Sequence, residues 1–253
     1  MPIRVGNLVR TAKDLPGLPA GVIGRVREVG RLFIAVQFPD GHIAYYAPRQ
    51  LQVLAQLNGD PPTGRVPLAH LGFTRRRVPH GSHLCLLPAS DAEVNASVAL
   101  YLAAGLKAGD LCFALAPTDW YEPLSEALER LNLDMSQALA SGDLLLSDSR
   151  EYYLAGRDFK ADKQVDKLAN LLDGLNADAG RKLRGFGRVP AALSDLDLKE
   201  WWEYEKRVTP LLAAAQLLGM CDYGPLPSDS AIAEGARATH PYVVSGSSVT
   251  ALS

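Results

Sequence analysis

Cysteine is scarce in this sequence: Cys85, Cys112 and Cys221 are the three among 253 residues. Because their number is odd and they are widely spaced, they match neither a disulfide framework nor the close cysteine pairs of a zinc ribbon. Long apolar runs are missing too, so no segment approaches the length of a membrane span and the N-terminus has no signal-peptide core. We therefore expect a cytoplasmic protein that has no membrane partner.

The sequence also lacks an excess of charge of one sign. Its net charge is −2, with 21% charged and 47% hydrophobic residues, which is ordinary for a globular protein. Strong nonspecific binding to nucleic acid is therefore not expected. The short basic run Arg75–Arg77 is typical of solvated surface, although contact with phosphates or acidic partners stays open for it.

The motifs of common catalytic sites are absent from the sequence. It contains no G-x-S-x-G elbow, no HExxH motif and no convincing nucleophilic triad. The turn Leu87–Ser90, which follows the apolar run His83–Leu87, contains no glycine and no lysine. A phosphate-binding loop needs both, so we predict a non-catalytic protein that does not bind a nucleoside triphosphate at this turn. No cofactor follows from these residues.

What the sequence does contain is a repeated alternation of strands and helices, beginning with the stretch 80–117. There, Ser90 and Glu93 fit a capping box at the start of an amphipathic helix. The helix separates two apolar runs, 83–87 and 111–116, which are thus predicted to be parallel strands. Further strands are expected at 144–147, 182–189, 220–223 and 242–245, and further helices after Thr118 or Asp119 and at 161–175, 197–218 and 228–237. This alternation predicts an α/β fold in which helices cover both faces of a mostly parallel sheet, with ligands near the carboxyl ends of the strands.

The first 55 residues have a different pattern. Five short alternating segments separated by glycine- and proline-rich turns predict a small all-β barrel over 1–55. A linker is expected over 56–77, where proline and glycine concentrate at 56–67, and the α/β domain over 78–253. The stretch Gly21–Gly41 resembles SH3-like barrels of the KOW type. That resemblance implies a docking or dimerising module for a protein partner, or a module that binds RNA.

Histidine, cysteine and glutamate supply the candidate site residues. His83 and Cys85 alternate on one strand and so point to one face, and Cys221 is placed to approach them. Glu205 lies on an apolar helical stripe, where a carboxylate must be paired or neutral. Arg184 and Arg188 are its expected partners. Glu205 then either forms a structural ion pair with an arginine, which holds the helix to the sheet, or supplies the polar end of a small apolar pocket.

Aromatic residues are candidates for the wall of that pocket. We expect Tyr153, Tyr223 and Trp120 to line it or to pack in the core beside it. His240, which precedes Pro241, is expected to be a hydrogen-bonded structural residue. A metal or haem site formed by the cysteines and histidines stays open as an alternative.

Several short motifs resemble the MEDS family, the methanogen/methylotroph sensory domain, over residues of about 78–246. They are HLC at 83–85, GLKAGDLCFAL at 105–115, EYYLAGRDF at 151–159, KLRGFGRVP at 182–190, EYEKRV at 203–208, CDYG at 221–224 and HP at 240–241. The resemblance implies a RecA/KaiC-like core without its phosphate-binding loop. It also implies that small hydrocarbon derivatives are sensed and the signal is passed to a partner.

These observations together predict a regulatory sensor that binds a small organic ligand and relays the signal to a protein partner through the N-terminal barrel. The predicted ligand-binding residues are His83, Cys85, Tyr153, Arg184, Glu205, Cys221 and Tyr223. Two alternatives stay open: a metal- or haem-binding protein or enzyme that uses the cysteines and histidines, and a nucleic-acid-associated protein that acts through the barrel. The ligand and the oligomeric state, a homodimer included, do not follow from the sequence.

Overall fold

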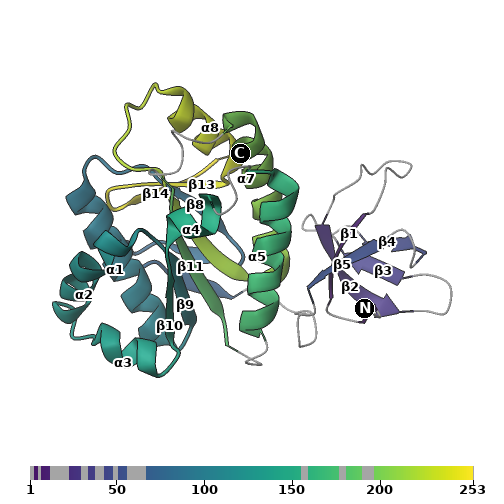
Figure 1. Ribbon diagram of the computed structural model, residues 1–253, viewed down its shortest axis with the longest axis horizontal. Helices are drawn as coiled ribbons and strands as arrows, with labels where there is room; N and C mark the ends of the chain where they lie inside the picture. Colours follow the sequence, from purple (N-terminus) through teal and green to yellow (C-terminus); the bar gives the residue numbers. More distant parts are fainter. Residues whose placement is uncertain are drawn as a thin grey trace.

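The computed structural model contains a seven-stranded sheet between two layers of helices, and a separate five-stranded sheet near the N-terminus (Figure 1). It describes residues 3–4, 7–11, 23–29, 34–37, 43–47, 51–55, 67–154, 159–176, 181–189 and 197–252. Among these residues, no helix is both long enough and apolar enough to cross a membrane.

The large sheet has the strand order β10-β9-β11-β12-β8-β13-β14, and every neighbouring pair is parallel except the last. Its strands are β8 (His83–Leu86), β9 (Leu111–Leu115), β10 (Leu144–Ser147), β11 (Leu183–Arg188), β12 (Leu217–Asp222), β13 (Tyr242–Ser245) and β14 (Ser248–Ala251). The α/β class that the alternation predicts is confirmed.

Helices cover both faces of this sheet. They are α1 (Asp91–Ala108), α2 (Tyr121–Glu129), α3 (Met135–Ala140), α4 (Ser149–Leu154), α5 (Ala161–Asn176), α7 (Leu198–Ala215) and α8 (Ala231–Thr239), with a short 3-10 turn, η2 (Thr118–Trp120). Figure 1 shows α1, α2 and α3 on one side of the sheet and α5 and α7 on the other. Alternate residues of β8, β9, β11 and β12 therefore enter two separate apolar cores.

Local sequence signals account for several helix ends. Ser90 caps α1 by accepting a hydrogen bond from the Glu93 amide at 3.3 Å, as the capping box predicts. Helix α7 is shorter than the predicted helix 197–218, because Gln216 adopts a left-handed φ of 54° and Leu217 begins β12. The predicted strand 220–223 thus begins three residues too late. Strand β14 and helices α3 and α4 were not expected from the sequence.

The N-terminal sheet is antiparallel throughout and has the order β4-β3-β2-β1-β5. Its strands are β1 (Leu8–Thr11), β2 (Ile23–Val29), β3 (Ile34–Gln37), β4 (Ile43–Tyr46) and β5 (Leu51–Ala55). Val9, Val26, Ile34, Val36 and Leu51 form its own small core. An all-β N-terminal unit is thus present, whereas the SH3-like character of the unit stays a prediction.

The predicted linker over 56–77 falls partly outside the described residues, since the description resumes at residue 67. There, β6 (Leu68–His70) and β7 (Arg77–Pro79) form a two-stranded antiparallel sheet. Ala69, Leu71 and Val78 are buried in the core that α1 also enters. The part of the linker that is described therefore packs on the α/β unit, and the boundary of 77 stays a prediction.

Candidate functional site

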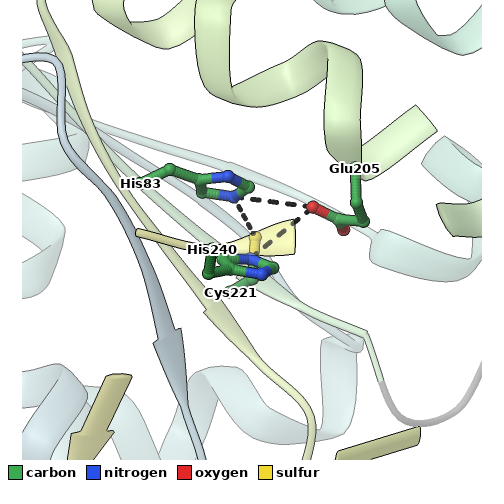
Figure 2. A group of neighbouring side chains, drawn as sticks. All are labelled: His83, Glu205, Cys221 and His240. Atoms are coloured by element: carbon green, nitrogen blue, oxygen red, sulfur yellow. Dashed lines mark hydrogen bonds and ion pairs between the residues drawn. The ribbon is translucent and has the colours of Figure 1, made fainter. Parts of the chain in front are cut away.

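Four side chains from distant parts of the sequence meet beneath α7 (Figure 2). His83 is the first residue of β8, Cys221 lies near the end of β12, and His240 stands between α8 and β13. Glu205 projects from the middle of α7. Since β8 lies between β12 and β13 in the sheet, the fold itself brings His83, Cys221 and the residue that precedes β13, His240, together.

The donor atoms of these four residues lie within 4.8 Å of one another. Glu205 Oε2 is 3.6 Å from the Nε2 atoms of both His83 and His240. His83 Nε2 is 3.2 Å from Cys221 Sγ. The two imidazole rings are 3.9 Å apart between centroids. His83 and His240 are almost fully buried, and so is Glu205.

The second nitrogen of each histidine is fixed by a hydrogen bond. His240 Nδ1 lies 2.8 Å from the carbonyl oxygen of Ala236. His83 Nδ1 lies 2.9 Å from the hydroxyl of Thr209, which itself donates to the carbonyl of Thr239 at 3.1 Å. A carbonyl only accepts hydrogen bonds, so both Nδ1 atoms carry the proton and both Nε2 atoms turn a lone pair toward Glu205.

Burial favours the neutral form of all four groups. It lowers the pKa of His240 to about 4. The pKa of His83 is lowered well below its usual value, by burial and by the neighbouring His240. Burial raises the pKa of Glu205 to about 8, and the Tyr223 hydroxyl partly offsets this effect. Burial and Glu205 raise the pKa of Cys221. At neutral pH the site thus holds a thiol rather than a reactive thiolate.

A small cavity of about 40 Å³ extends from His83 and Cys221 along the face of the sheet. Most of its wall is apolar or aromatic. The lining residues are His83, Phe113, Leu115, Tyr153, Leu168, Gly185, Phe186, Gly187, Tyr204, Val208, Leu212, Leu217, Gly219, Met220 and Cys221. Gly185 and Gly187, which weaken the strand signal in the sequence, lie in β11 and help to leave room on this face.

The structure brings most of the predicted site residues to this region. Cys85 pairs in register with Cys221 and enters the same core. The Tyr153 side chain lines the cavity, although it comes from α4 rather than from a strand end. Tyr223 lies edge-on to His240, with ring centroids 5.6 Å apart. The cavity lies on the sheet face rather than beyond the carboxyl ends of the strands, where we expected it.

Arg184 is the predicted site residue that lies elsewhere. It points into the opposite core, where its guanidinium pairs with Asp110 at 2.9 Å and donates to the carbonyls of His70 and Tyr101. Arg188 pairs with Asp91 at 2.6 Å. The predicted Glu205–Arg pair is therefore wrong: alternate residues of β11 point to opposite faces, and both arginines face away from α7.

A groove with a volume of about 470 Å³ lies at the carboxyl ends of the strands. It is lined by Asp91, Asn95, Pro117, Asp119, Trp120, Arg150 and Arg188. Trp120 therefore belongs to this groove and to the core on the α1 side, not to the cavity beneath α7. Of the basic run at 75–77, Arg76 donates to the carbonyl of Val249, so it holds the β14 edge in place.

His240 is the site residue that the sequence interpretation placed outside the site. It does make the expected structural hydrogen bond, yet its other nitrogen faces Glu205. The feature of the sequence that could have placed His240 in the site is its position just before a predicted strand. Only the pairing of β13 with β8 shows that this position lies beside His83.

Comparisons with known proteins agree with this fold. The family model described as "MEDS: MEthanogen/methylotroph, DcmR Sensory domain" matches residues 82–241. A KaiC-like protein, PH0186, from the hyperthermophilic archaeon Pyrococcus horikoshii OT3 is similar in structure, with a TM-score of 0.54 and 12% identity over 71% of this chain and 80% of that one. An uncharacterized protein, PH0321, from Pyrococcus horikoshii, solved in complex with an unknown peptide, gives a TM-score of 0.50 and 14% identity over 66% and 78%. No curated protein matches the sequence.

Proposed function

This chain belongs to the MEDS family of sensory domains, and on that basis we propose that it is a non-catalytic sensor of a small organic compound. The compound binds in the cavity between the sheet and α7. The observation that carries the proposal is the cavity itself: an apolar, partly aromatic wall that ends at a buried polar cluster. The chemical composition of this wall, a largely apolar lining with a few polar groups, is typical of small-molecule sites, whereas its volume is far below theirs.

The volume of the cavity limits the ligand. At about 40 Å³, it has space for only about three water-sized probes. A compound with one or two carbon atoms fits that space without a rearrangement of the wall. This size supports a simple hydrocarbon derivative, such as a short alcohol, amine, thiol or halide, as the ligand class.

A role in sensing rather than turnover is supported by the state of the polar groups. While the site holds no metal ion, burial favours the neutral forms of the Cys221 thiol and the Glu205 carboxyl, whereas covalent catalysis needs an activated nucleophile. Binding instead selects among conformations of the protein.

Helix α7 offers a route from the cavity to the N-terminal sheet. Val208 and Leu212 of this helix line the cavity, and α7 also packs against β1 and β2. Leu8 and Ile23 from these strands enter the same core as Leu211. We infer that a shift of α7 on ligand binding changes how the N-terminal sheet is presented to a protein partner.

The experiment that tests this function is a binding screen on the purified chain with one- and two-carbon alcohols, amines, thiols and halides. A ligand should raise the melting temperature by about 5–10 °C at a concentration near 100 times its Kd. It should also change tryptophan fluorescence, because the Trp201 ring lies 5.3 Å from that of Tyr153, which lines the cavity.

Gly187→Ala is the matched cavity variant. The added methyl group enters the cavity and meets only the Tyr153 hydroxyl, at 3.1 Å, so the variant should fold and bind the ligand at least tenfold more weakly. Arg150→Gln, in the groove at the carboxyl ends, serves as the control and should bind normally. If Arg150→Gln loses binding and Gly187→Ala keeps it, the ligand binds in the groove at the carboxyl ends of the strands instead. A screen in which no compound binds would refute the proposal.

A further inference from the structure

We propose that His83, Glu205, Cys221 and His240 bind a divalent first-row transition-metal ion, for which Zn²⁺ is the best match. The donor set consists of two imidazole nitrogens, one thiol sulfur and one carboxyl oxygen. Imidazole and thiolate suit zinc and its neighbours, whereas calcium and magnesium prefer oxygen ligands alone. The metal site itself does not depend on the proposed sensory function.

The separations between the donor atoms support this assignment. A tetrahedral Zn²⁺ site with ordinary bond lengths places its ligand atoms about 3.3–3.6 Å from one another. Three of the separations here are 3.2, 3.6 and 3.6 Å. A distance of 3.6 Å between nitrogen and oxygen is too long for a hydrogen bond, so the two histidine–glutamate contacts are not explained by hydrogen bonding within the protein.

Two of these buried atoms lack a partner of their own. Glu205 Oε2 and His240 Nε2 make no hydrogen bond in the described part of the chain, although both are shielded from solvent. Burying such atoms without a partner is costly, and a buried polar atom in a native protein is usually satisfied by a partner, by water or by an ion. An ion placed between the four donors would satisfy both of them.

The outer hydrogen bonds point in the same direction. Zinc-binding histidines usually donate their second N–H to a carbonyl, carboxylate or water, which fixes the ring and turns the lone pair of the other nitrogen to the metal. His240 does this with the carbonyl of Ala236 and His83 with the hydroxyl of Thr209. Both rings are therefore held in the tautomer that metal binding requires.

A haem is not compatible with this cluster. The adjoining cavity of about 40 Å³ accommodates a molecule of a few heavy atoms, far less than a porphyrin. A single ion requires no such space, because it lies among the side chains. The haem alternative left open by the sequence is thus disfavoured relative to a mononuclear site.

The ion would also join two parts of the fold. His83, Cys221 and His240 belong to or adjoin the sheet, whereas Glu205 belongs to α7. His83 and Cys221 also line the cavity, so a small ligand in the cavity lies next to the ion. If the proposed sensory function holds, a ligand that coordinates the ion competes with Glu205, and this releases α7 from the sheet.

Cobalt substitution tests the site directly. The purified chain is analysed for bound metal, stripped with a chelator and titrated with Co²⁺. We expect one ion per chain, visible bands typical of tetrahedral Co²⁺ and a near-ultraviolet band from thiolate coordination. Cys221→Ala should remove the thiolate band, whereas Cys112→Ala, which alters a buried cysteine in the other core, should keep it.

Two further variants separate metal binding from folding. Thr209→Val, which preserves the shape of the side chain, removes the partner of His83 Nδ1 and should weaken Co²⁺ binding by roughly 10–100-fold. His240→Gln should weaken it more, and His80→Gln, at a buried histidine outside the cluster, should not. Folding of each variant is checked by circular dichroism. If Cys221→Ala or His240→Gln fails to fold, Thr209→Val and the wild-type spectrum still decide the question.

The outcomes distinguish this inference from the sensory function. A folded wild-type chain that shows no bound metal and no thiolate band with Co²⁺ would overturn the metal site, and so would an equal loss in Cys112→Ala. A Co²⁺ site with the expected spectrum that responds to no small compound would confirm the metal and refute the sensor. A ligand response that survives chelation, in a chain without any Co²⁺ signal, would support the sensory function and refute the metal site.

Discussion

At the scale of single residues, Arg184 shows how a buried charge can serve the fold instead of a ligand. Its side chain is 1% exposed. The guanidinium lies over the Tyr101 ring, pairs with Asp110 and donates to two backbone carbonyls that come from α1 and β6. Because a guanidinium has five donors in a fixed plane, one side chain connects a helix, a hairpin and the sheet.

Removing this arginine should therefore destabilise the protein without affecting the cavity. Arg184→Met leaves Asp110 as a buried, unpaired carboxylate, and breaking such a pair typically costs about 3–5 kcal/mol. The double variant Arg184→Met/Asp110→Leu should regain a large part of this loss, since no charge is then left unpaired. Urea unfolding of the three proteins measures the difference. If the single variant keeps full stability and loses the ligand response instead, Arg184 is a ligand-binding residue after all.

Residue-scale features of the site could be predicted from the sequence only in part. Glu205 was recognisable, because a carboxylate on an apolar helical stripe needs a partner. His83 and Cys221 were recognisable as candidate ligands by residue type. Their meeting with His240 was not predictable, since it depends on β8 lying between β12 and β13. The identity of the partner of Glu205 depends on which face each strand presents, and a single sequence does not settle that.

At the scale of elements, the start of α1 is occupied by a side chain of the protein itself. The Glu93 carboxylate accepts hydrogen bonds from the amide of Ala89 at 2.8 Å and from the amide of Gly246 at 2.7 Å. It thus binds the N–H group just before the N-cap of α1 and a second N–H group from the turn between β13 and β14, beside a helix N-terminus, which is a place where phosphates are commonly bound in proteins. A carboxylate of the chain itself stands at the positive end of the helix dipole.

We therefore predict that the chain binds no ATP at this turn, with or without Mg²⁺. Glu93→Ala should still bind none, because the turn offers no lysine, and it should lower the free energy of unfolding by about 1–2 kcal/mol through the lost capping bonds. Isothermal titration calorimetry measures the first quantity and urea unfolding the second. Magnesium-dependent ATP binding in the micromolar range, by either protein, would contradict this account.

Element boundaries were predictable wherever a local signal marks them. The capping box places the start of α1, and turn residues place β10 and β13. The end of α7 carries no such signal, because apolar residues occupy both its last turn (residues 211–215) and the start of β12 (Leu217 and Leu218). Gln216 between them adopts its left-handed conformation without a glycine. The spacing of apolar residues alone does not show where a helix ends when a buried strand follows it directly.

At the scale of the whole molecule, the N-terminal sheet lies beside α5 and α7 (Figure 1). Its contacts with these helices are both apolar and charged. Leu8 and Ile23 belong to the same apolar cluster as Val165 of α5 and Leu211 of α7. Arg10 of β1 pairs with Asp166 at 3.2 Å and lies 3.8 Å from Asp162, which in turn pairs with Arg207 of α7 at 2.6 Å. One carboxylate on α5 thus links the N-terminal sheet to the helix that carries Glu205.

This link should make the contact between the two units sensitive to acid. The hydrogen bond with Arg207, and the charges of Arg207 and Arg10, lower the pKa of Asp162. A carboxyl whose pKa is lower in the folded state stabilises that state at pH above its ordinary value of about 3.9, and the contribution is lost as the pH falls through the lowered pKa. Because Asp162 is largely exposed, the effect should stay below about 1 kcal/mol.

Hydrogen exchange of β1 and α5 at pH 7 and at about pH 3 should therefore show faster exchange at the contact in acid, after correction for the intrinsic dependence of exchange on pH.

The variant Asp162→Asn should exchange faster at the contact already at pH 7, because its amide cannot pair with Arg207 and Arg10 as a carboxylate does. Asp229→Asn, on the loop before α8, is the control and should behave like the wild type. Sodium chloride at 1 M should reproduce part of the Asp162→Asn effect, since it screens exposed ion pairs. If Asp162→Asn and the wild type exchange alike at both pH values, Asp162 does not contribute to the contact between the two units, and the proposed relay through α7 does not depend on its ion pairs.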